Sequence, residues 1–176
     1  MKGLTRILRV IDSINEWTGK KFSIISIALM LVVVYDVFMR IIGYATLWGL
    51  EFSGFLLLAL TYLAGGYVLL HGGHVSVDII HKALPKRAKA LIDSLTYLVF
   101  FIVPIILVCT GGQVAFQSLR DNTLSPSAWG PPMWPSQILI PIGGLLIGIQ
   151  ALARWIRCVH VLVRGTEIEG SKANGS

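Results

Sequence analysis

Long apolar stretches separated by short polar segments dominate the pattern of the chain. Four stretches hold few or no charged residues, over residues 22–44, 48–70, 91–114 and 136–157. Each is close to the roughly 20 residues that an α-helix, rising about 1.5 Å per residue, needs to cross the hydrocarbon of a bilayer. The pattern therefore predicts an all-α membrane protein with four transmembrane helices.

The segment before the first span has a different pattern. At helical spacing its apolar side chains fall on one side and its charged side chains on the other. The apolar side holds Leu4, Ile7, Leu8, Ile11 and Ile14, and the polar side holds Arg6, Arg9, Asp12, Ser13 and Glu16. Such a helix lies on the membrane surface, where its basic residues suit anionic headgroups; a polar leader with chance periodicity is the alternative. We expect an amphipathic interfacial helix over 1–20, a transmembrane domain over 21–158 and a cytoplasmic tail over 159–176.

Composition narrows the class of protein further. Of the 176 residues, 55% are hydrophobic and 14% are charged, whereas soluble domains have about 45 to 50% and 25%. A soluble globular fold is therefore excluded. Four spans with short connections leave no room for a catalytic, nucleotide-binding or ligand-binding domain outside the bilayer, so we expect neither an enzyme nor a cofactor.

The basic residues predict the orientation. The formal net charge is +6, and the basic residues flank the spans rather than forming a nucleic-acid surface. One side would hold Lys2, Arg6, Arg9, Lys20, Lys21, Lys82, Lys86, Arg87, Lys89, Arg154, Arg157, Arg164 and Lys172, and the other side Arg40 and Arg120. Because basic loops stay in the cytoplasm, both termini and the 71–90 connection are expected there. The 45–47 and 115–135 connections would be external.

Three ionisable residues lie within or at the edge of the first two spans. Asp36 and Arg40 are four residues apart on one helical face, and Glu51 follows Trp48 by three residues at the start of the second span. We predict that Asp36, Arg40 and Glu51 form one cluster near the external surface. A proton or cation relay is one interpretation. We favour a polar clasp that fixes two helices or a partner chain, because the third and fourth spans have no charge at mid-depth.

The cytoplasmic connection carries a group of potential metal ligands, namely His71, His74, Asp78 and His81. A divalent metal site is one interpretation. However, Gly72 and Gly73 are placed to end the second helix, so the four side chains need not share one helix axis. We therefore favour a helix end at which His74 binds exposed carbonyls and Asp78 lies in the first turn of the next short helix, with Pro85 starting the helix that contains the third span.

The external connection is rich in proline and tryptophan. It contains Pro126, Pro131, Pro132 and Pro135 together with Trp129 and Trp134. The prolines restrict the backbone, so we expect a stiff cap with its rings at headgroup level. Simple anchoring and a docking surface for an external partner both remain open. In the fourth span, Gly144 and Gly148 permit close approach of another helix.

Several motifs resemble those of one known family. Trp48 and Glu51 match a W-x-x-E element that opens the second helix. A G-H-x-x-V-D and L-P element is matched by Gly73, His74, Val75, Val77, Asp78, Leu84 and Pro85, and a proline and tryptophan loop by Ser125, Pro126, Trp129, Pro131, Trp134, Pro141 and Gly143. Over roughly residues 20–157 the chain resembles the small, DctQ-like membrane subunit of bacterial tripartite ATP-independent periplasmic (TRAP) transporters.

This resemblance implies a division of labour in the bacterial inner membrane. A large, DctM-like subunit would carry the substrate and sodium sites and move as an elevator, and a periplasmic, DctP-like protein would deliver a small organic acid. The small subunit would be a scaffold. A self-sufficient multidrug exporter is the alternative, although its essential acid lies in mid-span, whereas Asp36 is nearer the external end and is followed by Arg40. A haem-binding cytochrome would need histidines inside the predicted spans, which hold none.

Overall fold

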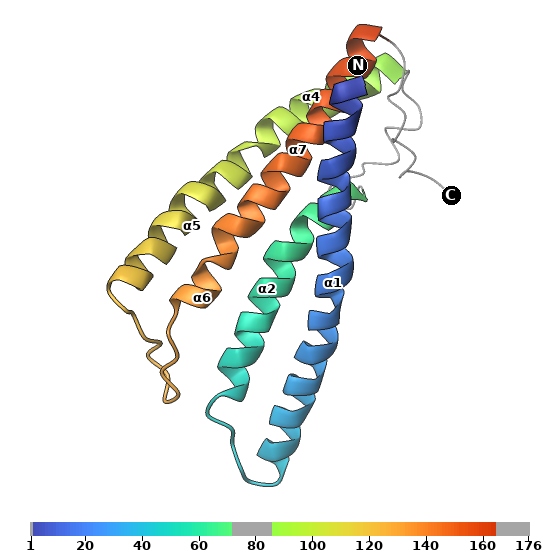
Figure 1. The fold of residues 1–176 in the computed structure, drawn as a ribbon. Coiled ribbons are helices and arrows are strands. Elements are labelled where there is room, and N and C mark those ends of the chain that lie inside the picture. Colours follow the sequence, from blue (N-terminus) through green and yellow to red (C-terminus); the bar gives the residue numbers. More distant parts are fainter. Residues whose placement is uncertain (1, 72–85, 165–176) are drawn as a thin grey trace.

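The described part of the chain is a bundle of helices. A computed structural model describes residues 2–71 and 86–164, and the predicted cytoplasmic motif residues Gly73, His74, Asp78 and Pro85 lie outside these ranges. The helices are α1 (Lys2–Ile41), α2 (Gly49–Leu70), α4 (Lys86–Phe100), α5 (Ile102–Arg120), α6 (Trp134–Gln137) and α7 (Leu139–Arg164) (Figure 1). The described residues hold one isolated β-bridge, between Leu124 and Pro132, and no longer strand.

Four helical segments are long and apolar enough to cross a membrane, which confirms the predicted number of spans. They run over Thr5–Ile41, Gly49–Leu70, Leu91–Arg120 and Trp134–Val163. The third segment is broken at Phe101, between α4 and α5. Pro104 explains the break, because it has no N–H to bond the carbonyl of Phe100 four residues earlier.

The first helix differs from the prediction in its extent. We expected an interfacial helix over 1–20 followed by a separate span, but α1 is one helix of 40 residues. Between residues 4 and 41 there is no proline, and Gly19 is the only glycine. Gly19 does not interrupt the helix. It lets α1 and α2 approach closely, because a Cβ there would lie 2.2 Å from Cγ of Tyr67 on α2. Residues 2–20 are therefore continuous with the first span in one helix.

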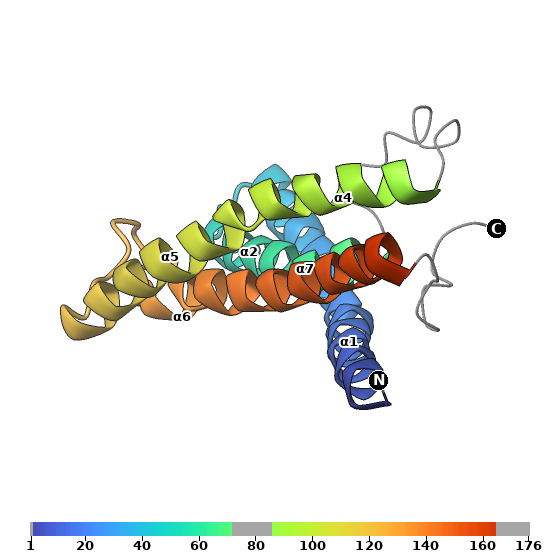
Figure 2. The same ribbon diagram turned by 90° about the horizontal axis from the view of Figure 1, so that it is seen from above.

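Helix α7 occupies the centre of the bundle. It packs against α1, α2, α4 and α5, and seen from above α1 runs obliquely with its N-terminus away from α4 and α5 (Figure 2). Glycines allow the close approaches. A Cβ at Gly143 would lie 2.6 Å from the carbonyl oxygen of Tyr62 on α2, and one at Gly144 would lie 2.9 Å from Cβ of Leu107 on α5. Gly148 also faces α5, so both glycines of the G-x-x-x-G pair contact that helix.

The glycine contacts generate a testable prediction. Gly143→Ala should lower the free energy of unfolding by about 1 to 3 kcal/mol, because the added methyl collides with backbone that cannot rotate away. Gly112→Ala is the matched control, since no atom lies within 4 Å of a Cβ at that helical position. Thermal unfolding of the purified chain in mild detergent measures both. Equal stability of the two variants would contradict this account of α2–α7 packing.

Candidate functional site

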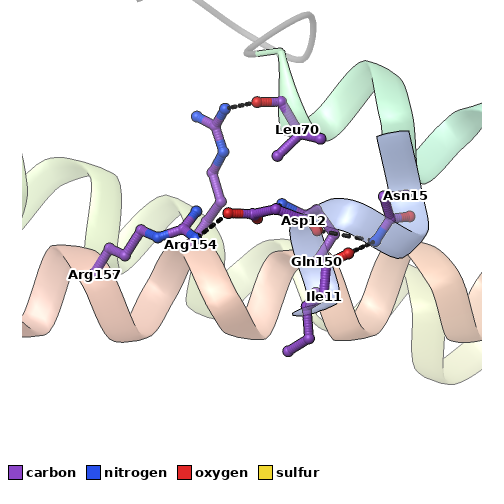
Figure 3. Close-up of polar contacts among 7 residues, drawn as sticks. All are labelled: Ile11, Asp12, Asn15, Leu70, Gln150, Arg154 and Arg157. Carbon is purple, nitrogen blue, oxygen red and sulfur yellow. Dashed lines mark hydrogen bonds and ion pairs between the residues drawn. The ribbon is translucent and has the colours of Figure 1, made fainter. Parts of the chain in front are cut away.

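A hydrogen-bonded network joins α1 to α7 near the N-terminal end of the bundle (Figure 3). We call Asp12, Asn15, Gln150 and Arg157 the α1–α7 clasp. Asn15 Nδ2 donates to Gln150 Oε1 at 2.9 Å, and Gln150 Nε2 donates to Asp12 Oδ1 at 3.0 Å. Arg157 Nη2 forms an ion pair with Asp12 Oδ2. The network thus runs without interruption from one amide to a charged pair.

Helical spacing brings each pair of clasp residues to one face. Asp12 and Asn15 are three residues apart on α1, and Gln150 and Arg157 are two turns apart on α7. Asn15 is 1% exposed and Gln150 is 0% exposed. A buried amide without a partner is costly in a low-dielectric interior, so the observed rotation and register of α1 against α7 is favoured because it pairs Asn15 Nδ2 with Gln150 and Gln150 Nε2 with Asp12. The clasp therefore fixes how these two helices meet.

Gly66 of α2 packs directly against Asn15 of the clasp. A Cβ at Gly66 would lie 1.9 Å from Asn15 Oδ1, so no larger residue fits there while Asn15 keeps its position. Asn15 Oδ1 is buried and accepts no hydrogen bond from the described residues. The amide is thus held by its Nδ2 bonds to Gln150 and to the Ile11 carbonyl, the latter at 3.2 Å.

A second arginine of α7 ties the end of α2 to the same region. Arg154 Nη2 donates to the carbonyl oxygen of Leu70, the last residue of α2. Carbonyls at a helix C-terminus lack partners within the helix and carry partial negative charge, which a cation stabilises. Arg154 and Arg157, expected only to mark one side of the membrane, thus also join α7 to α2 and to α1.

The predicted cluster in the first two spans is divided between two places at the opposite end of the bundle. Arg40 Nη2 pairs with Asp36 Oδ2 at 2.8 Å, and Thr46 Oγ1 donates to Asp36 Oδ1. Asp36 is 8% exposed. Trp48 stacks on Tyr35 of α1, with ring centroids 6.0 Å apart. These contacts hold the end of α1 to the turn and to the start of α2.

Glu51 does not join Asp36 and Arg40, contrary to the prediction. Its Oε2 accepts a hydrogen bond from Ser127 Oγ in the loop before α6. The residue of α2 that faces Asp36 is Gly49, where a Cβ would lie 2.5 Å from Asp36 Oδ1. Glu51 follows two residues later, about 200° around the helix, so it points away from α1. Sequence spacing indicated a similar depth but not this rotation.

The loop that carries the predicted cap residues is a tied hairpin. Ser125 N donates to the Pro131 carbonyl at 2.9 Å, and Met133 N donates to the Thr123 carbonyl at 3.0 Å. Pro131 is buried, whereas Pro126 and Trp129 are exposed, and Trp134 opens α6. Gly130 takes a left-handed φ of 60°, which suits glycine. Together with the Ser127 bond to Glu51, these contacts attach the loop to α2.

The described polar contacts lie at two levels of the bundle, one near Asn15 and one near Asp36. The stretch of α1 from Asn15 to Asp36 is about 30 Å long. In the middle of the four spans, residues 22–35, 52–70, 94–119 and 138–153 contain no Asp, Glu, Lys, Arg or His. His71 Nδ1 lies 3.1 Å from the Tyr67 carbonyl, and residues 2–71 and 86–164 hold no group of three potential metal ligands.

Comparison with known proteins gives one family. The tripartite ATP-independent periplasmic transporters, DctQ component, match over residues 29–161. The matched range contains α2, α4, α5 and α6, most of α7 and the last part of α1. No curated protein matches the chain.

Removing one clasp amide should destabilise the bundle. Gln150→Leu is expected to lower the free energy of unfolding by about 1 to 3 kcal/mol, because the Asn15 amide loses its partner while buried. The double variant Asn15→Leu with Gln150→Leu should recover part of this loss, since the buried Asn15 amide that Gln150→Leu leaves without its partner is then gone. Unfolding in mild detergent measures each variant.

Gln113 provides the control for this prediction. It is exposed on α5, so Gln113→Leu makes the same chemical change without leaving a buried group unpaired and should not lower stability. Equal losses for Gln113→Leu and Gln150→Leu would show that the clasp contributes nothing specific.

Proposed function

Because the chain belongs to the DctQ component family of the tripartite ATP-independent periplasmic transporters, it is a small, multi-pass membrane component of such a transporter, and we propose that it acts there as a non-catalytic scaffold. The transporter would be a sodium-driven symporter that imports a small organic acid. The chain would support a large, DctM-like elevator subunit in the inner membrane. It would also help dock a periplasmic, DctP-like binding protein.

The observation that carries this proposal is how the polar groups at the two ends of the bundle are used. Asp12, Asn15, Gln150 and Arg157 bind one another across α1 and α7, and Asp36 binds Arg40 and Thr46 at the other end. Each of these contacts fixes a helix or a turn. A chain whose polar groups are occupied in this way suits a fixed body against which another subunit moves.

The distribution of arginines supports the proposed orientation. The N-terminus and the end of α7 lie at the same end of the bundle (Figure 1), together with Arg154 and Arg157. Arg40 and Arg120 lie at the helix ends on the other side. By the positive-inside rule, the termini are cytoplasmic. The hairpin loop with Trp129 would then face the periplasm, where a binding protein approaches.

The alternative function is a self-sufficient multidrug exporter, and the surroundings of Asp36 argue against it. An exporter of this kind needs an acid that is open to protons and substrate within the bundle. Asp36 is almost fully buried and is bound by Arg40 and Thr46. Its carboxylate thus already has a cationic partner.

The proposal predicts which components move substrate. In liposomes, the large subunit with this chain and the binding protein should take up an organic acid in the presence of a sodium gradient. This chain alone should take up none, and it should copurify with the large subunit in mild detergent. Uptake or drug export by this chain alone would overturn the scaffold.

Variants of the ionisable residues separate a scaffold from a relay. In the full complex, Asp36→Asn and Glu51→Gln should leave the sodium dependence of uptake unchanged, because neither carboxylate handles the coupling ion. The measurement is the initial uptake rate against sodium concentration, with copurification as the control for assembly. Retained assembly with lost sodium dependence would identify a relay instead.

A further inference from the structure

The first half of α1 has a buried face and an exposed apolar face. Leu8, Asn15 and Thr18 are buried against the rest of the bundle. On another side lie four large apolar side chains that this chain does not cover: Ile7, Val10, Ile14 and Trp17, which are 60%, 52%, 50% and 62% exposed. The clasp holds the buried face in place, so the apolar face cannot turn inward.

A third face of the same segment is cationic. Arg6, Arg9 and Lys20 lie on this face and are exposed, whereas the exposed Lys21 falls at the end of the apolar face. Lys20 pairs with Glu16 at 2.7 Å, but no hydrogen bond or ion pair with a described residue engages Arg6, Arg9 or Lys21. By contrast, residues 22–35 of α1 contain no charged side chain, as expected of a helix within hydrocarbon. The division into apolar and cationic faces is thus confined to the first half.

The length and direction of α1 agree with a surface position for this half. A helix of 40 residues is about 60 Å long, roughly twice what the hydrocarbon core requires. In the view from above, α1 slants across the bundle and its N-terminal end lies outside the group formed by the other helices (Figure 2). An oblique helix with separate apolar and cationic faces can place the first in the acyl boundary and the second among headgroups.

We propose that the first half of α1 binds the anionic phospholipid surface of the membrane at that end of the bundle. Ile7, Val10, Ile14 and Trp17 enter the boundary between headgroups and acyl chains, where tryptophan is favoured. Arg6 and Arg9 contact lipid phosphates. A second copy of this chain on the same face would bring these unpaired arginines close to their own equivalents, so like charges oppose that occupant. The transporter role is not a premise of this inference.

The test compares two neighbouring positions of the full chain in nanodiscs. Ile14→Cys and Ser13→Cys are made separately in a background with Cys109→Ser and Cys158→Ser, and each reacts with a water-soluble maleimide. Ser13 lies on the cationic side of α1 and Ile14 on the apolar side. In discs that contain phosphatidylglycerol, the Ile14→Cys variant should react about tenfold or more slowly than the Ser13→Cys variant. In phosphatidylcholine alone this difference should shrink.

Charge variants test the anionic part of the proposal. Arg6→Gln with Arg9→Gln, added to the Ile14→Cys variant, should remove the effect of phosphatidylglycerol on its reaction rate. Arg120→Gln, which removes an exposed cation at the other end of the bundle, should leave that effect intact. Protection that is equal in both kinds of disc and insensitive to Arg6 and Arg9 overturns anionic recognition. Equal rates at positions 13 and 14, or protection that requires the large subunit, overturn lipid binding altogether.

A second measurement needs no substitution. Native mass spectrometry of the unaltered chain, released from an equal mixture of the two lipids, should retain more phosphatidylglycerol than phosphatidylcholine. Equal retention of the two lipids contradicts the proposal. Because the chain is unaltered, this result does not depend on whether the arginine variants fold.

Discussion

The structure depends on the need to satisfy polar groups that cannot reach water. Asn15 and Gln150 are fully buried, and each amide finds its partner on the other helix. Because a buried amide without a hydrogen bond is costly, this contact selects one rotation of α1 against α7. That rotation directs Asp12 toward Arg157 of α7 and Asn15 toward Gly66 of α2. It also turns Ile7, Val10, Ile14 and Trp17 outward.

The polar groups lie at two levels, and small or apolar residues fill the space between them. Gly65 meets Ile147, Gly143 meets Tyr62, and Gly144 meets Leu107, so the helices approach closely where they carry no charge. Close packing of this kind leaves few ways to rearrange, because packed interiors deform little without losing contacts. A bundle held by polar contacts at both ends and by glycine contacts between them is well suited to the fixed part of a moving assembly.

The number and composition of the spans follow from the sequence, because hydrocarbon imposes length and polarity directly. The Asp36 and Arg40 contact follows from a spacing of four on one helix. The clasp was missed because Gln150 is one amide in an apolar run and its partner Asn15 is 135 residues away. Asp12 was assigned to the solvent side, since periodicity separates two faces but does not say which one packs. The prediction that Glu51 joins Asp36 and Arg40 was wrong for a related reason. The depth of a residue can be counted along a helix, but the rotation of that helix depends on tertiary contacts such as that between Gly49 and Asp36.

The central claim is that α1 and α7 stay together as one body while the transporter works. Spin labels at Ser13→Cys on α1 and Leu152→Cys on α7, with both native cysteines replaced by serine, would report the distance between the helices in the assembled complex. Pulsed electron resonance would record it without substrate, with sodium, and with sodium and substrate. We expect one distance distribution that does not change among these states. A shift or a second population that depends on sodium or substrate would show that the clasp opens during transport, and the chain would then be a moving part.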